Sequence, residues 1–427
     1  MKLRTLTLPA SDSQISNDSQ PPTTSPLVGE VADERSESAG GGSYLLQMLP
    51  PPAERRLYET TFVDLPDNGG GVKRASGDVI AFLSVSKPAP ATLSAKEIAD
   101  GWIMLFDGES TFGWKVDGAA EVKDGALILG KGKRTIAAPI TQFDSFDLAM
   151  DATGGGQFEF KNARNSGSLG FKGDAFHIEL KVRRENASTT SVTHATGPDR
   201  TRLVIGDVET NSPVTLSIHI PDGNKLAIKS LKLRPHGEKP LFNGKNLDGW
   251  KQYTGDAKRS ATKFTVTAEG ELSAKNGPGD LRTEKQFDDF VLQFECKTNG
   301  KALNSGIFFR CIANQYQNGY EAQIQNAFLL DRSKPVDFGT GAIYRRVKAR
   351  KVVSNDNEWF TMTVAARGAH IATWVNGYQT VDWTDDRKPN DNPRQGLRTA
   401  KGHLSIQGHD PTTDLLFRNI RIAELGK

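Results

Sequence analysis

The stretch that decides the fold is LNSGIFFRCIANQYQNGYEAQIQ, residues 303–325. If NSGIFFR is extended, Ile307 and Phe309 lie on one side of it, and Phe308 and Arg310 lie on the other. The segment GYEAQI alternates in the same way. Alternation with a period of two predicts two β-strands here rather than a helix.

Four further segments of the C-terminal half also alternate. Turn residues separate them, and Asn376-Gly377 within an apolar frame is a strong signal for a two-residue hairpin. Strands of this length with turns every ~8–12 residues and almost no helical pattern predict an antiparallel β-sandwich. The four segments are FVLQFEC (290–296), FTMTVAA (360–366), HIATWVN (370–376) and LLFRNIRI (415–422).

The whole chain has 427 residues and a formal net charge of +3. This length suggests roughly two or three domains. Basic and acidic residues are interleaved without a cationic stripe, so nucleic-acid binding has no support. No segment approaches the ~20 apolar residues that span a bilayer. The sequence does not indicate an oligomeric state.

The first 100 residues carry no motif that indicates a function. Residues 1–48 are polar and rich in Ser, Gly and Pro, which predicts disorder or a misassigned start codon, with Met48 as an alternative start. No signal-peptide pattern is visible at the N-terminus. Residues 49–100 are predicted to form a short β segment and a linker, in which Ser94 caps a helical turn and Glu97 completes a capping box.

From residue 101 onward the sequence repeats itself. Trp102–Trp114 and Lys239–Trp250 share the form Leu-Phe-Asp/Asn-Gly followed by Gly-Trp. Four later pairs keep the same order at offsets of roughly 140 residues, which predicts two tandem copies of one β domain, at residues 101–237 and 238–427. The later pairs are FDSFDLAMD (143–151) with FDDFVLQFE (287–295), NSGSLGF (165–171) with NSGIFFR (304–310), FHIEL (176–180) with YEAQI (320–324), and NKLAIKSLKLRPHG (224–237) with LLFRNIRIAEL (415–425).

As a set, the motifs of the second copy resemble the 3-keto-disaccharide hydrolase domain family. The resemblance covers about Lys239 to Leu425 and implies an all-β fold of two tandem concanavalin-like, jelly-roll sandwiches, the first of them diverged. It also implies periplasmic location or secretion, while the sequence alone leaves the compartment unknown. The matching elements are LFNGKNLDGW, FDDFVLQFECK, NSGIFFR, GYEAQI, TGAIYR, NEWFTMTV, VNGYQTVDW and FRNIRI.

The activity that the resemblance implies is cleavage of 3-keto-glycosides or 3-keto-disaccharides. A keto group at C3 acidifies the proton on C2, so a base can remove it, the group at C1 is eliminated and water is added. This chemistry needs one base, one stabiliser of negative charge and one proton donor, whereas an ordinary glycosidase uses two carboxylates. The alternative is a non-catalytic carbohydrate-binding β-sandwich protein, because one fold serves both functions.

Three residues are predicted to be catalytic. Glu321 or His409 would act as base or acid, since burial raises a carboxyl pKa and the histidine pKa lies near neutrality. Arg310 would stabilise charge on the C3 oxygen through its fixed fork of donors. The competing interpretations are a solvated strand for the carboxylate, an exposed loop histidine and an ion-paired arginine.

Six residues are predicted to bind the sugar. Gln323 shares the face of Glu321 and would orient the ring. Aromatic residues such as Trp359 could stack on a sugar, although core packing is the competing interpretation. Asn304 fits turn chemistry first and a ligand contact second. The six residues are Asn304, Tyr320, Gln323, Tyr344, Trp359 and Gln407.

The repeat sharpens these predictions by contrast. Its alignment puts Phe171 at the place of Arg310, and His177 and Glu179 at the places of the Glu/Gln pair. Asn-Ser-Gly recurs in both copies and is therefore interpreted as architectural. Arg310 and the Glu/Gln pair do not recur unchanged, so they carry the functional prediction.

No cofactor is predicted and no metal ligand is nominated. The sequence has no phosphate loop, zinc pattern or GxSxG motif. Cys296 and Cys311 are predicted to be buried free thiols rather than a pair. A divalent cation such as calcium is possible in loops rich in aspartate, without a liganding pattern. These aspartates are Asp331, Asp337, Asp385, Asp386 and Asp391.

Overall fold

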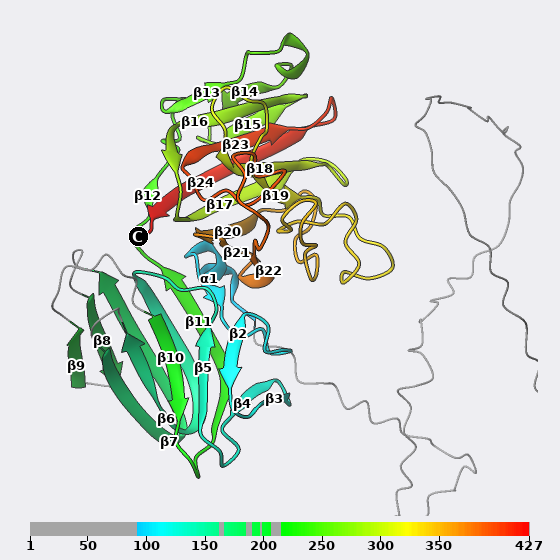
Figure 1. Cartoon of the computed structure of the whole chain (residues 1–427). Coiled ribbons are helices and arrows are strands. Elements are labelled where there is room, and N and C mark those ends of the chain that lie inside the picture. The colour runs from blue at the N-terminus through cyan, green and yellow to red at the C-terminus, as the bar shows by residue number, and fades with distance from the viewer. Residues whose placement is uncertain (1–91, 162–165, 185–189, 197–198, 206–214, 427) are drawn as a thin grey trace, which may run out of the picture. The chain divides into compact units, whose positions relative to one another are not determined.

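The computed structural model describes residues 92–161, 166–184, 190–196, 199–205 and 215–426 (Figure 1). The predictions for residues 1–48 and for strands between residues 49 and 91 lie outside the described residues. Helix α1 (Ala95–Ala99) confirms the predicted capping box, because Ser94 and Glu97 each accept a hydrogen bond from the other's backbone N–H. No described helix is long and apolar enough to cross a membrane.

Residues 239–424 form two antiparallel sheets with a shared hydrophobic core between them. The strands are β12 (Lys239–Pro240), β13 (Trp250–Gln252), β14 (Lys263–Val266), β15 (Leu272–Lys275), β16 (Gly279–Phe287), β17 (Phe290–Thr298), β18 (Ser305–Cys311), β19 (Tyr320–Ile324), β20 (Phe360–Arg367), β21 (His370–Val375), β22 (Tyr378–Thr384), β23 (Gly402–Gly408) and β24 (Asp414–Glu424). The eight-stranded sheet has the order β14-β15-β24-β17-β20-β21-β22, with β12 added beside β24. The five-stranded sheet has the order β13-β16-β23-β18-β19. The predicted sandwich is confirmed for this region.

Local signals in this region also held. Asn376 and Gly377 both have positive φ, 48° and 77°, and join β21 to β22 in the predicted two-residue turn. Cys296 and Cys311 are buried free thiols, as predicted. They lie in β17 and β18, which belong to different sheets.

Residues 103–235 form a single antiparallel sheet of eleven strands within the described ranges. The strands are β1 (Ile103–Met104), β2 (Trp114–Asp117), β3 (Ala120–Lys123), β4 (Ala126–Leu129), β5 (Thr135–Pro139), β6 (Phe146–Lys161), β7 (Ser166–Arg184), β8 (Thr190–Thr196), β9 (Asp199–Ile205), β10 (Thr215–Ile220) and β11 (Leu226–Pro235). The long strand β6 pairs with β11 over its first half and with β10 over its second half. Because β6 and β7 run through both halves, this region lacks the two separate sheets of the second.

The repeated Leu-Phe-Asp/Asn-Gly…Gly-Trp motif builds the same corner twice. The indole N–H of Trp114 donates to the carbonyl oxygen of Leu105 at 2.6 Å, and that of Trp250 donates to Leu241 at 3.1 Å. Asp107 accepts hydrogen bonds from the backbone two and three residues ahead, and so does its counterpart in the second motif, Asn243. The motif therefore encodes one local structure at both places.

The strand pairing corrects the alignment of the middle of the repeat. In the second region β18 pairs with β23. In the first region the second half of β6, Gln157–Lys161, pairs with β10, so this half of β6 takes the place of β18. The second half of β7 pairs with the first half of β6, as β20 pairs with β17. His177 and Glu179 thus occupy the place of β20, and Phe171 does not correspond to Arg310. The predicted match was wrong by one strand.

The outer face of the eight-stranded sheet is covered by residues of the first region. The amide of Gln293 donates to the carbonyl oxygen of Gly101 at 2.9 Å. The indole N–H of Trp374 donates to the carbonyl oxygen of Met104 at 3.2 Å, and this ring belongs to the core of the first region. The candidate face for a ligand in the second region is therefore the outer face of its five-stranded sheet.

Candidate active site

The outer face of the five-stranded sheet carries two rows of mostly polar side chains. Leu281, Ile307, Ala322 and Ile406 face the core, so their neighbours along each strand point outward. Strand register aligns Asp280, Gln407, Gly306 and Gln323 in one outward row. It aligns Arg282, Ser405, Phe308 and Glu321 in the other.

Loops cover this face and bury most of it. The carboxamide of Gln407 donates to Gln317 Oε1 at 3.1 Å, and Arg394 Nε donates to the carbonyl oxygen of Gln317 at 3.0 Å. The Arg394 guanidinium also lies 5.4 Å from the centre of the Phe308 ring. The polar rows consequently line an enclosed environment rather than an exposed sheet.

Glu321 is the titratable group that this enclosure changes most clearly. It is 6% exposed, and its carboxyl group has no hydrogen-bond partner among the described residues. Burial raises its pKa from 4.5 to about 8, against the opposing charge of Arg394. Gly306 makes room for it, because a Cβ there would stand 2.7 Å from Glu321 Oε1.

Glu321 borders a cavity of about 190 Å³. Its wall includes the guanidinium-bearing residues Arg345, Arg346 and Arg394, together with Tyr344. The Arg345 guanidinium lies 5.3 Å from the centre of the Tyr344 ring. The cavity therefore places a carboxyl group of raised pKa next to guanidinium cations and a phenol, which is an arrangement typical of acid–base sites.

Asn304 and Gln323 contact each other on the outer side of this sheet, and their predicted contact with a sugar stays a prediction. The Gln323 amide donates to Asn304 Oδ1 at 3.2 Å, and both amides donate to Asp337 Oδ2, at 3.2 Å and 2.8 Å. The charge of Asp337 also contributes to the raised pKa of Glu321. These contacts tie the start of β18 and the middle of β19 to the covering loop.

Three buried acceptor oxygens on the outer face have no hydrogen-bond partner among the described residues. They are Asp280 Oδ1, Gln323 Oε1 and Gln407 Oε1. All three belong to the row interrupted by Gly306. Buried acceptors normally find a donor, so this row is suited to groups that donate, such as hydroxyls.

The structure does not bring Arg310 to the cavity. The residue is 0% exposed, with φ at +52°, and the register of β18 against β23 shifts between Phe308 and Cys311. This bulge turns the side chain away from the face that alternation predicted. Its guanidinium donates to three backbone carbonyl oxygens at 2.7–2.9 Å and to Asp289 at 3.1 Å. The geometry gives it a structural task in place of the predicted contact with substrate.

His409 and Trp359 also lie away from the cavity wall. His409 follows the end of β23 and pairs with Asp410 at 2.8 Å, with its side chain 41% exposed. Trp359 precedes β20, and the Arg418 guanidinium lies 4.0 Å from its ring centre. The competing interpretation, an exposed loop histidine, describes His409 better, whereas Trp359 is partly exposed and does not belong to the hydrophobic core.

Tyr320 lies at the edge of the site but points into the core. Its ring stacks on Phe309 with centroids 5.4 Å apart, and its hydroxyl donates to Asp385 Oδ2 at 2.6 Å. Burial raises the pKa of Tyr320 to about 12. Tyr320 and Tyr344 both line the cavity, and the predicted contact of each with a sugar stays a prediction.

Sequence reasoning missed the arginines of the cavity. Arg345 ends the motif TGAIYR and has φ at +58°, whereas Arg394 lies in a loop rich in Asn and Pro. Neither loop has a periodic pattern that assigns its side chains to a face. The one sequence signal for a cation at the site was the arginine at the end of TGAIYR, and this signal concerns Arg345 only.

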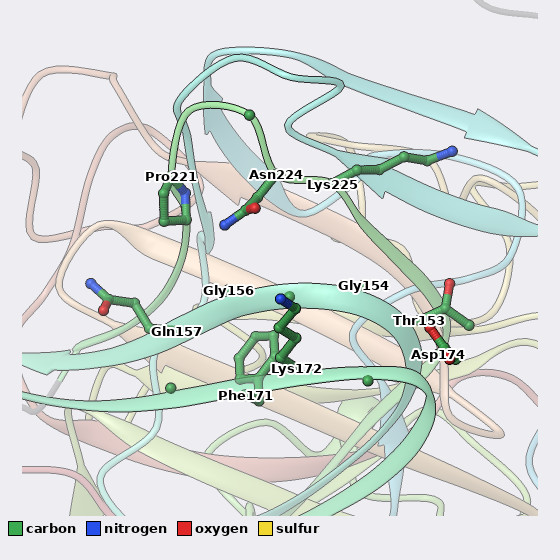
Figure 2. A pocket seen from close by; sticks show the side chains of 14 residues that line it. Thr153, Gly154, Gly156, Gln157, Phe171, Lys172, Asp174, Pro221, Asn224 and Lys225 are labelled. Carbon is green, nitrogen blue, oxygen red and sulfur yellow. The ribbon is translucent and has the colours of Figure 1, made fainter.

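A larger cavity, of about 790 Å³, lies in the first region. Figure 2 shows it between the bend of β6 at Gly154–Gly156 and the turn that carries Pro221 and Asn224. Glycine backbone makes up much of its wall, and Phe171 and Lys172 of β7 lie along one side. None of its described lining residues is a buried titratable group comparable to Glu321, so the candidate site considered further is the one in the second region.

Within the described residues, no group of three or more His, Cys, Asp or Glu lies together in a way that could hold a metal ion. Four of the five loop aspartates have protein partners, among them Asp337, which accepts hydrogen bonds from Asn304 and Gln323, and Asp391, which lies 3.8 Å from the Arg398 guanidinium. Asp385 pairs with Arg387 at 2.7 Å, and Asp331 accepts a hydrogen bond from the backbone of Ser333 at 2.7 Å. The calcium site stays a prediction without a liganding geometry.

Comparison with known proteins shows that the second region is similar to a known family. Residues 237–423 match the family model described as the 3-keto-alpha-glucoside-1,2-lyase-like domain. This confirms the resemblance seen in the motifs and relates the region to carbohydrate-active proteins. No curated protein matches the chain.

Several solved structures are similar to parts of the chain. Two are proposed glycosyl hydrolases from Parabacteroides distasonis. One is 23% identical over 44% of this chain and 94% of its own, with a TM-score of 0.36. The other is 27% identical over 44% and 100%, with a TM-score of 0.35. The carbohydrate-binding module CBM66 from Bacillus subtilis is 14% identical over 41% and 96%, with a TM-score of 0.31.

Proposed function

We propose that the second region cleaves 3-keto-glycosides by removing the proton on C2. The observation that carries this proposal is the unpartnered carboxyl group of Glu321, buried in a cavity lined by Arg345, Arg394 and Tyr344. One carboxyl group suffices for elimination next to a ketone, whereas direct glycoside hydrolysis ordinarily uses two. The family match supports a sugar substrate.

The reaction assigns a task to each cavity residue. Glu321 in its ionised form removes the C2 proton, and the electron pair moves into an enediolate whose negative oxygen is at C3. Arg394 stabilises that oxygen. Its charge already acts on the Glu321 carboxyl group, so it also acts on negative charge that forms beside Glu321. The enediolate then re-forms the C3 ketone, makes a double bond between C1 and C2, and expels the oxygen at C1. The Tyr344 hydroxyl supplies the proton to this oxygen. Water then adds across the double bond: its oxygen bonds to C1 while its proton restores the Tyr344 hydroxyl, and Glu321, after exchanging its proton with solvent, protonates C2 and becomes ionised again.

The raised pKa of Glu321 suits this role. A carboxylate whose conjugate acid has a pKa of about 8 is a stronger base than an ordinary one, and a fraction of it is ionised near neutral pH. The value of kcat/KM is therefore expected to rise with pH up to about 8 and then to level off. The row of buried acceptors would receive hydroxyl groups of the sugar, with Gln323 and Gln407 as its main members.

The test is turnover of 3-keto-trehalose and 3-keto-sucrose, which is measured as the release of free sugar. The protein is expected to release sugar, and Glu321→Gln is expected to lower kcat/KM by roughly 10²–10⁴-fold, the usual contribution of one acid–base group. Glu284→Gln is the matched control, because Glu284 lies on β16 of the same sheet and is exposed. Its kinetics should equal those of the unmodified protein.

The same experiment separates catalysis from binding. If keto sugars bind and no sugar is released at any pH between 6 and 9, the non-catalytic carbohydrate-binding function is correct and the proposal fails. If turnover occurs but Glu321→Gln retains it, the reaction class stands and the assignment of the base is wrong.

We also propose that residues 101–237 are a diverged copy of the second domain that supports it rather than catalysing. The repeated corner and the matching order of strand pairs support common descent. The contact of Gly101 and Met104 with the eight-stranded sheet supports the stabilising role. Removal of residues 1–237 should therefore lower the stability of the second domain and expose the ring of Trp374.

A further inference from the structure

The cavity beside Glu321 carries more positive charge than the proposed reaction needs. Arg345, Arg346 and Arg394 border it, and Glu321 is the single carboxyl group among its lining residues. One guanidinium can stabilise an enediolate oxygen. Because the Glu321 carboxyl group is largely neutral near pH 7, the wall has a surplus of cations toward a neutral sugar.

Nearby carboxylates offset this surplus only in part, since the charge of Asp385 acts on Arg346. Among the described residues, none of the three arginines forms an ion pair with an aspartate or glutamate. The acidic groups of the adjoining loop are already engaged, because Asp385 pairs with Arg387 at 2.7 Å and Asp391 lies 3.8 Å from the Arg398 guanidinium. The cavity therefore keeps its positive charge.

The arginines do not have equal freedom to meet a ligand. Arg346 donates to the carbonyl oxygens of Arg345 and Arg394, so it ties the two loops together. Burial lowers the pKa of Arg346, and the charge of Arg387 adds to this effect. The Nε of Arg394 already donates to the carbonyl oxygen of Gln317. Arg345 is exposed at the rim and no hydrogen bond of its guanidinium is present among the described residues, which leaves its fork free for a ligand.

We propose that the sugar held in this cavity carries an anionic group, a carboxylate, sulfate or phosphate, which Arg345 binds at the rim while Arg394 faces the reacting centre. The inference rests on the proposed function for the position of the sugar ring beside Glu321. It adds the chemical class of the substrate: a glycoside of an acidic sugar, or of a sugar bearing an acidic substituent. Planar carboxylates suit the guanidinium fork best, because they accept two parallel hydrogen bonds.

The test measures binding of non-reacting probes to the full-length protein by isothermal titration calorimetry at low salt. Methyl α-D-glucuronide, glucose 6-sulfate and glucose 6-phosphate are compared with the neutral methyl α-D-glucoside. At least one anionic probe should bind about tenfold or more tightly than the neutral one, and the preference should shrink as salt is added. Arg345→Gln should reduce that ratio to about one, whereas the exposed Arg134→Gln should leave it unchanged. The three anionic probes distinguish the three acidic groups.

Equal affinity for all probes would overturn the inference, as would no measurable binding of any probe, or a preference that Arg345→Gln retains. Its failure is distinguishable from that of the proposed function. Turnover of neutral keto-glycosides with no anion preference removes only the anionic substrate class. Anion-selective binding with no turnover of neutral or acidic keto-glycosides removes only the reaction.

Discussion

The outer faces of β18 and of the second half of β6 have the same neighbours in the strand order but different surroundings. In the second region, residues 325–359 and the loop around Arg394 cover the face and bury Glu321 without a partner. In the first region, the matching face leaves Glu159 partly exposed, where it pairs with His219 at 2.6 Å. Related strand order therefore gives either an ion pair or a buried acid, and the covering loops decide which.

The largest expected effect concerns the fully buried arginine of β18. Arg310→Ala should lower the free energy of unfolding by roughly 3–5 kcal/mol, because it leaves three partly buried carbonyl oxygens without this donor and removes the buried cation that pairs with Asp289. Urea denaturation measures this change. Arg183→Ala in the first region, which removes a partly exposed partner of Asp147, should cost about 1 kcal/mol or less. Equal losses in the two variants would contradict the contrast.

The next effect is the pH dependence of stability. The pKa of Glu321 is raised from 4.5 to about 8 in the folded protein, so the folded state keeps a proton that the unfolded state loses in this window. The stability this group contributes is fully present below pH 4.5 and is lost as pH rises through about 8. Relative to Glu321→Gln, the unfolding free energy of the protein should fall by roughly 2–5 kcal/mol between pH 4.5 and pH 9. Parallel curves for the two proteins would show that the carboxyl group is not buried as described.

A smaller effect compares two glycines that face long side chains across a strand pair. A Cβ at Gly306 would stand 2.7 Å from Glu321 Oε1, so Gly306→Ala should displace the carboxyl group and lower kcat/KM by about tenfold or more. Gly170 pairs with Gln157 in the first region, and a Cβ there meets nothing within 4 Å. Gly170→Ala should leave turnover unchanged. A normal rate for Gly306→Ala would mean that the position of Glu321 is not critical.

The smallest effect is expected on the open face. Glu159→Gln removes one member of a partly exposed ion pair, so the unfolding free energy should change by about 1 kcal/mol or less. Turnover of keto sugars should not change. A loss of activity in this variant would show that the first region also contributes to catalysis.

Local patterns predicted the fold well, and the site less well. Alternation, the Asn376-Gly377 turn and the capping box at Ser94 depend on a few neighbouring residues, so the sequence reveals them directly. Alternation also put Glu321 and Gln323 on the correct face. It failed at Arg310 because a bulge with positive φ interrupts the period of two.

The rest of the site depends on long-range contacts. Arg394 reaches the sheet through Gln317, a residue 77 positions earlier in the chain, and no local pattern encodes that contact. The alignment of the repeat was shifted in the first region, where β6 and β7 each run on without a break. A short motif within such a long strand can be matched to either of two neighbouring strands of the second region.

The central claim, removal of the C2 proton by Glu321, is tested most directly by the fate of that proton. The protein is incubated with 3-keto-trehalose in D₂O, and the released keto sugar is examined by NMR against a sample without protein. The predicted result is that every newly released molecule carries deuterium at C2. In Glu321→Gln, the incorporation of deuterium should fall in the same proportion as turnover. Released keto sugar that keeps its original hydrogen at C2 would contradict the account.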